Sequence, residues 1–142
     1  MQEQLPTMRD HLQVALACFA ASLVIGAAYT SVTPQLSAYA PIPLNGIWFT
    51  LITGVCTIFL GIGIGHKRPR AVLAGAAAVS LLSSVFYGIM LALPTFSPDA
   101  RNIIGVVNFA LTQSTVTLII VSFIVFPGAL IGLLASYFWY YR

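Results

Sequence analysis

Charged side chains are scarce in this chain of 142 residues. Asp, Glu, Lys and Arg make up 6% of it and hydrophobic residues 59%, whereas soluble domains carry about 25% charged residues. The only acids are Glu3, Asp10 and Asp99, and the only histidines are His11 and His66; none of them falls inside a long apolar run. Acid–base catalysis, proton relays and ion paths need such groups. We therefore expect no catalytic residue and neither a pump nor a cation channel.

Cysteine is nearly as rare. Cys18 and Cys56 are the only two, neither belongs to a CxxC motif, and both lie in apolar runs, which predicts buried free thiols that pack as small hydrophobes. A metal site built from two histidines and Asp10 is underfilled. We expect no metal and no cofactor, and three basic residues in one turn predict no nucleic-acid surface.

Long apolar runs fill the rest of the sequence. A membrane-spanning helix needs about 20 mostly apolar residues, and the runs at about 12–33, 44–65 and 71–93 each satisfy this. The remainder, 103–142, is too long for one crossing and too short for two. We predict an all-α fold, an integral membrane four-helix bundle that forms a single transmembrane domain over 1–142.

The fourth crossing is the least determined. The aromatic and basic C-terminal end is typical of a membrane interface and favours a crossing at about 115–140. A Ser-Pro-Asp sequence at 97–99 is typical of a helix start, which predicts a separate short helix over 98–112. The rival register, a crossing at 103–125 followed by an interfacial tail, stays open. In the favoured register Pro127 predicts a kink, which would serve as a hinge or as a static fit.

Basic residues flank the predicted spans unequally. Of the six Lys and Arg residues, five lie on the side of the two termini and Arg101 alone lies on the other. Since the positively charged side is normally the cytoplasm, we expect a multi-pass protein of the cell membrane with both termini cytoplasmic. The same residues attract anionic lipid at the inner face. The predicted membrane-surface anchors are Lys67, Arg68, Arg70, Trp139 and Arg142.

Small residues recur at helical spacing in the second and fourth spans. Such stripes let helix backbones approach closely in lipid, as in GxxxG pairs. Packing within the bundle is the first expectation. Because two helices each carry a GxxxG pair, the pattern also predicts one spare face for a neighbour, on the fourth span. The predicted helix-packing residues are Gly54, Gly61, Gly65, Gly128, Gly132 and Ser136.

One polar segment lies inside the membrane if the fourth crossing begins near 103 and mostly at the outer headgroup level if it begins near 115, and it divides the functional hypotheses. We predict a small membrane protein that acts through helix contacts with itself or another membrane protein, as scaffold, accessory subunit or homo-oligomer, without catalytic activity. The alternative is an oligomeric passive pore or small-molecule carrier lined by that segment. Its polar-lining candidates are Asn108, Thr112, Gln113 and Thr115.

Overall fold

The computed structural model describes residues 8–32, 45–65, 68–93 and 103–140 of the chain. Within them there are four long α-helices, each apolar and long enough to cross a membrane. The predicted all-α four-helix membrane architecture is thereby confirmed. The helices are α1 (Met8–Val32), α2 (Gly46–Gly65), α3 (Pro69–Ala92) and α4 (Ile103–Tyr140).

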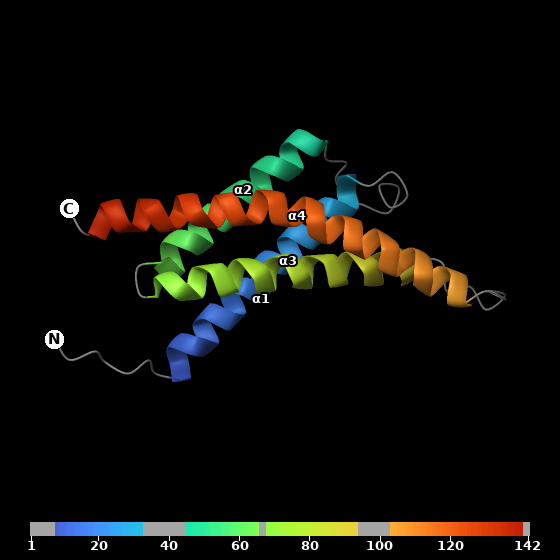
Figure 1. Ribbon diagram of the computed structural model, residues 1–142, viewed down its shortest axis with the longest axis horizontal. Helices are drawn as coiled ribbons and strands as arrows, with labels where there is room; N and C mark the ends of the chain where they lie inside the picture. The colour runs from blue at the N-terminus through green and yellow to red at the C-terminus, as the bar shows by residue number, and fades with distance from the viewer. Residues whose placement is uncertain (1–7, 33–44, 66–67, 94–102, 141–142) are drawn as a thin grey trace.

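The helices form an elongated bundle (Figure 1). α3 and α4 lie side by side along the long axis, while α1 and α2 run obliquely to it. The start of α1 and the end of α4 lie at the same end of the bundle (Figure 1). α2 and α4 run in the same direction, because Gly61 lies against Gly132 and Gly65 against Ser136.

The ends of α2 and the start of α3 follow from local sequence. The Asn45 side chain caps α2, since its Oδ1 accepts a hydrogen bond of 3.1 Å from the Trp48 amide, a donor that has no partner within the helix. Gly65 is the last residue of α2, and Pro69 opens α3, where the missing N–H of proline is harmless.

α4 corrects the prediction of a separate short helix over 98–112. From Ile103 the helix continues without a break through the polar segment to Tyr140, while 98–102 lie outside the described residues. Three threonine hydroxyls explain the continuity: Thr112, Thr115 and Thr117 each donate to the carbonyl four residues earlier, at 2.8–2.9 Å. Three hydroxyls of the segment are therefore satisfied without leaving the helix.

The resulting helix is unusually long, and its proline does not end it. Its 38 residues reach about 57 Å, whereas the hydrocarbon core of a bilayer is about 30 Å thick. Pro127 lies within α4 on an exposed side, and membrane helices tolerate such prolines when neighbours support the backbone.

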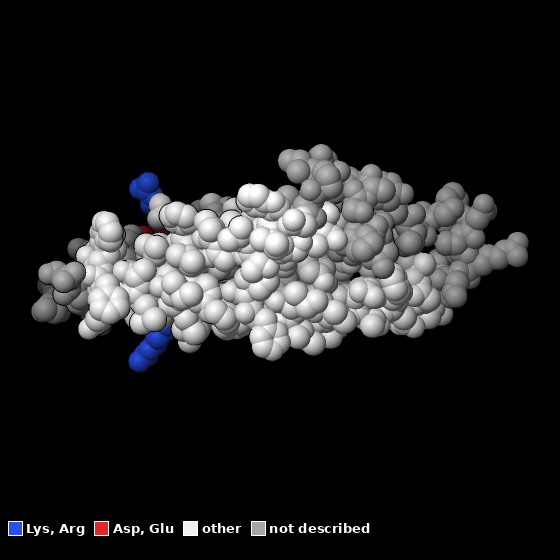
Figure 2. All heavy atoms as spheres, turned by 90° about the horizontal axis from the view of Figure 1, so that it is seen from above, with Lys and Arg blue, Asp and Glu red and all other residues white. Residues whose placement is uncertain are grey.

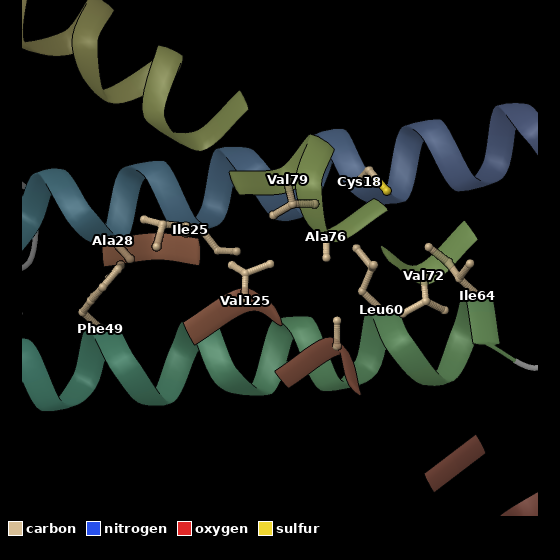
Figure 3. Packing of buried hydrophobic residues seen from close by; sticks show 12 residues of the cluster. Cys18, Ile25, Ala28, Phe49, Leu60, Ile64, Val72, Ala76, Val79 and Val125 are labelled. Carbon is tan, nitrogen blue, oxygen red and sulfur yellow. The ribbon is translucent and has the colours of Figure 1, made fainter. Parts of the chain in front are cut away.

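All four helices contribute to one core of mostly small and β-branched side chains (Figure 3). Val125 of α4 points between α1 and α2, close to Ile25 (Figure 3). At the end of the bundle away from the chain termini, the Tyr29 ring packs edge-on against Phe49 and Tyr87, with centroids 5.2 and 4.8 Å apart. These aromatic contacts join α1, α2 and α3.

Hydroxyl groups are also buried in the bundle. Ser83 Oγ of α3 lies 3.2 Å from the Ser22 carbonyl oxygen of α1 and 2.7 Å from the Val79 carbonyl of its own helix, so one hydroxyl bridges two helices. Thr53 Oγ1 and Ser80 Oγ are buried without a hydrogen-bond partner. An unpaired buried hydroxyl costs about 1–3 kcal/mol.

These two environments predict opposite responses to removal of a hydroxyl. Thr53→Val removes an unpaired polar atom at nearly constant shape, so we expect the free energy of unfolding to stay equal or rise by about 1 kcal/mol. Ser83→Ala removes the bridge to α1, and we expect a loss of about 0.6 kcal/mol. Reversible unfolding by SDS titration in mixed micelles measures both. A larger destabilisation by Thr53→Val than by Ser83→Ala would contradict the conclusion that the Thr53 hydroxyl is unpaired and the Ser83 hydroxyl bridges two helices.

Candidate functional site

No side-chain constellation typical of an active site lies in the described residues, so the candidate features are surfaces. Three can be built from the sequence upward: the contact between α2 and α4, a polar stripe on the outer side of α4, and the charged end of the bundle. The first determines which face of α4 remains free for the second, because the two surfaces lie on different sides of the same helix.

α2 and α4 approach each other closely at Gly61 and Gly132. A Cβ added at Gly61 would lie 2.6 Å from the Ala129 carbonyl oxygen and 3.0 Å from the Gly132 Cα. A Cβ added at Gly132 would lie 2.9 Å from the Gly61 Cα and would clash with the Ile58 carbonyl oxygen. Because the obstructing atoms are backbone atoms, the two helices would have to separate to admit any side chain.

The glycine contact continues for one turn on either side. Gly128 faces the Thr57 hydroxyl, and a Cβ at Gly65 would lie 2.7 Å from Ser136 Oγ. Gly54, predicted to share this face, is different, since no heavy atom lies within 4 Å of the Cβ position that it would carry. Its carbonyl oxygen nevertheless faces Gly128.

The interpretation that one GxxxG face is spare for a neighbour is therefore wrong. The pair on α4, Gly128 and Gly132, and the pair on α2, Gly61 and Gly65, pack against each other within one chain. All four glycines are buried. The sequence shows that each of the two helices carries a face of small residues, but only the tertiary structure shows that the two faces meet.

The predicted polar-lining residues lie on the outside of the bundle. Asn108, Thr112 and Thr115 are exposed and Gln113 is half-buried. The first three follow a spacing of four and three residues, which places them along one side of the helix. The buried residues Thr117, Val121 and Val125 lie on the opposite side. The polar stripe, defined here as Asn108, Thr112 and Thr115, points away from the core.

Hydrogen bonding differs within the polar stripe. The Thr112 and Thr115 hydroxyls donate to carbonyl oxygens of their own helix. The Asn108 side chain has no hydrogen-bond partner among the described residues, although its amide offers two donors and an acceptor. This leaves the amide with the largest unmet hydrogen-bonding capacity on the stripe.

The level of the polar stripe follows from the contact between α3 and α4. Gly88 lies against Ser114, whose Oγ would clash with a Cβ at that glycine. Since the α-helical rise is 1.5 Å per residue, Asn108 lies about 9 Å farther along α4 than Ser114. Ala92, the last residue of α3, lies about 6 Å beyond Gly88. Thr112 and Thr115 thus lie beside the last turns of α3, while Asn108 lies about 3 Å past its last residue.

The described charged residues gather at the other end (Figure 2). Arg68 Nη1 of the α2–α3 turn lies 3.1 Å from His11 Nδ1 of α1, so this contact ties the start of α1 to the turn. Arg9 and Arg70 are exposed there, and Trp139 is 84% exposed near the end of α4. The remaining anchor predictions, Lys67 and Arg142, lie outside the described residues, as does His66.

Within the described residues, no three His, Cys, Asp or Glu side chains come together as a metal site would require. Cys18 is buried, and its Sγ lies 3.3 Å from the Cβ position of Gly75 on α3. Cys56 is half-buried. The Cys18 thiol therefore occupies a place where a small side chain fits between α1 and α3.

The α2–α4 contact predicts a contrast among glycine substitutions. Gly61→Ala and Gly132→Ala force backbones apart, so we expect each to lower the free energy of unfolding by about 1–3 kcal/mol. Gly54→Ala and Gly63→Ala are matched controls on α2, because nothing lies within 4 Å of their Cβ positions. We expect them to be neutral or stabilising by up to about 1 kcal/mol. SDS titration distinguishes the groups, and equal effects in both would contradict the close approach.

Comparison with known proteins identifies no relative of this chain. No protein-family model, no curated protein and no solved structure matches the chain. Function is therefore inferred from the contacts, burial and charges of the chain's own residues.

Proposed function

We propose that this protein is a structural component of a membrane assembly, which acts through helix contacts made by the outer face of α4 and catalyses no reaction of its own. The observation that carries the proposal is the polar stripe on the side of α4 opposite the core. The stripe lies beside and just past the last turns of α3, where its amide and hydroxyl groups can bond to the polar groups of a neighbouring helix.

The length of α4 supports the same role. A helix of about 57 Å exceeds what one crossing requires, and α2 and α3 cover it on one side only. Exposed large hydrophobic residues flank the polar stripe, among them Val107, Leu111 and Val116. A face that combines apolar surface with a few polar groups suits a protein partner better than lipid alone.

The alternative, an oligomeric pore or carrier, has less support. A pore needs a polar path that continues through the membrane. Below Thr115 the outer face of α4 continues as Ile119, Phe123 and Leu130, which are 54%, 77% and 45% exposed. The polar groups occupy only the first turns of this face, which favours a local contact over a conducting path.

The basic residues at one end of the bundle indicate how the chain is oriented in the membrane. Arg9, Arg68 and Arg70 lie where α1 begins and α4 ends, and basic residues are normally retained on the cytoplasmic side. We infer that both ends of the chain are cytoplasmic in the cell membrane. There the arginines contact anionic lipid headgroups, each interaction contributing about 1 kcal/mol.

Cysteine labelling tests this orientation. In a chain with Cys18→Ala and Cys56→Ala, we expect Met8→Cys and Trp139→Cys to react with a membrane-impermeant maleimide only after permeabilisation of the cells. Ile104→Cys, at the other end of the bundle, should react in intact cells. All three sites are strongly exposed, at 90%, 84% and 75%. The reverse pattern would invert the topology.

Photo-crosslinking in native membranes tests the proposed role. A benzophenone amino acid at Ile119 on the outer face of α4 should give a protein adduct, while the same group at Phe59 of α2 or Leu81 of α3 should give lipid adducts only. All three positions are more than half exposed, so accessibility does not separate them. Lipid adducts alone at every position would overturn the proposal, and protein adducts only from α2 or α3 would overturn the assignment to α4.

A further inference from the structure

We propose that His11 and Arg68 together bind the phosphate of an anionic lipid headgroup, and that they bind it more tightly when the His11 imidazole is protonated. The inference rests on the lipid contacts proposed above for the arginines, and it adds a second residue and a pH dependence to one of them. Three observations carry it: the contact between the two side chains, its exposure at the charged end of the bundle, and the charges around it.

The first observation is the contact itself. His11 of α1 and Arg68 of the α2–α3 turn are 57 residues apart in the sequence. Arg68 Nη1 lies 3.1 Å from His11 Nδ1 and 3.4 Å from Nε2. A guanidinium offers donors only and stays charged, so it pairs with a neutral imidazole. Protonation of the ring places two cations in contact, and neither can then serve as the partner of the other.

The second observation is the exposure of this pair. His11 is exposed and Arg68 is half-buried, and both belong to the end at which the described charged residues gather (Figure 2). No residue over 8–17 of α1 is buried, so the start of this helix is open to the lipid and water around it. In the proposed orientation this is the inner headgroup level, where anionic phosphates are present.

The third observation concerns the neighbouring charges. Among the described residues the others at this end are Arg9 and Asp10 of α1 and Arg70 of α3, while α2 and α4 carry no charged side chain. Both of these arginines are exposed, and Asp10 already takes part in an interaction of its own. His66 and Lys67 of the same turn lie outside the described residues. Three arginines against one aspartate make this end positive even with a neutral imidazole.

A phosphate relieves the repulsion that protonation creates. Its oxygens accept charge-assisted hydrogen bonds from a guanidinium and an imidazolium at once, and its negative charge offsets the second cation. Histidine side chains ordinarily titrate near about pH 6.5, so such a pair gains its second positive charge as the pH falls through that region. The affinity for the phosphate therefore rises as the pH falls, and it drops again when the neutral ring returns to Arg68.

Lipid binding measured by native mass spectrometry tests the pair. His66→Gln leaves His11 as the only histidine of the chain. In this background, binding of phosphatidylglycerol and of phosphatidylcholine from detergent is compared at about pH 7.5 and about pH 5.5, on either side of the ordinary histidine range. We expect the preference for phosphatidylglycerol to rise at least about threefold at the lower pH. His11→Gln should abolish this rise, and Arg68→Gln should reduce it by more than about half.

A displaced histidine separates the pairing from added charge alone. Gln13 is exposed on α1, and two positions along an α-helix amount to about 200° of rotation. Gln13→His combined with His11→Gln therefore moves the titrating ring to another side of the helix, and we expect less than about half of the rise. An equal rise in this variant, or an undiminished rise in Arg68→Gln or His11→Gln, would overturn the proposal.

The two remaining outcomes separate this inference from the lipid contacts on which it rests. A preference for phosphatidylglycerol that is the same at both pH values would overturn the role of His11 and leave the proposed arginine contacts intact. No preference at either pH would overturn both. The proposed helix contacts of α4 depend on neither result.

Discussion

The close approach of α2 and α4 at Gly61 and Gly132 is the constraint on which the rest of the bundle depends. In lipid the hydrophobic effect does not drive helices together, so association depends on van der Waals contact between closely spaced backbones and on a few polar bonds. Backbone atoms would obstruct even a methyl group at either glycine. This contact sets the register of the two parallel helices, and with it the end of the bundle at which the basic residues gather.

The same contact determines the outward face of α4. A helix that turns its glycines and Val125 toward its neighbours must turn the residues half a turn away outward. Asn108, Thr112 and Thr115 lie on that outward side. The proposed function therefore follows from the core: internal packing on small residues leaves the most polar part of a long helix available to a neighbour.

Several features could be predicted from residue patterns because they depend on composition and local chemistry. Long uncharged runs require helices in a membrane, since lipid cannot satisfy an open backbone, and the described part of the chain contains four such helices. The predicted break in the last one was wrong, because hydroxyls that donate to their own backbone allow a polar run to remain helical. The cap of α2 by Asn45 also went unpredicted, although asparagine before an apolar run is a recognised signal of a helix start.

The sequence by itself determined that the protein lies in a membrane, that it has four helices long enough to span one, and which small and polar residues each helix carries. Those properties follow from hydropathy and helical period, which are local. Only the tertiary structure decided that the two GxxxG pairs meet inside one chain and that the polar stripe faces outward. Each helix carries apolar residues on every side, so hydropathy alone cannot distinguish a face that contacts lipid from one that contacts protein.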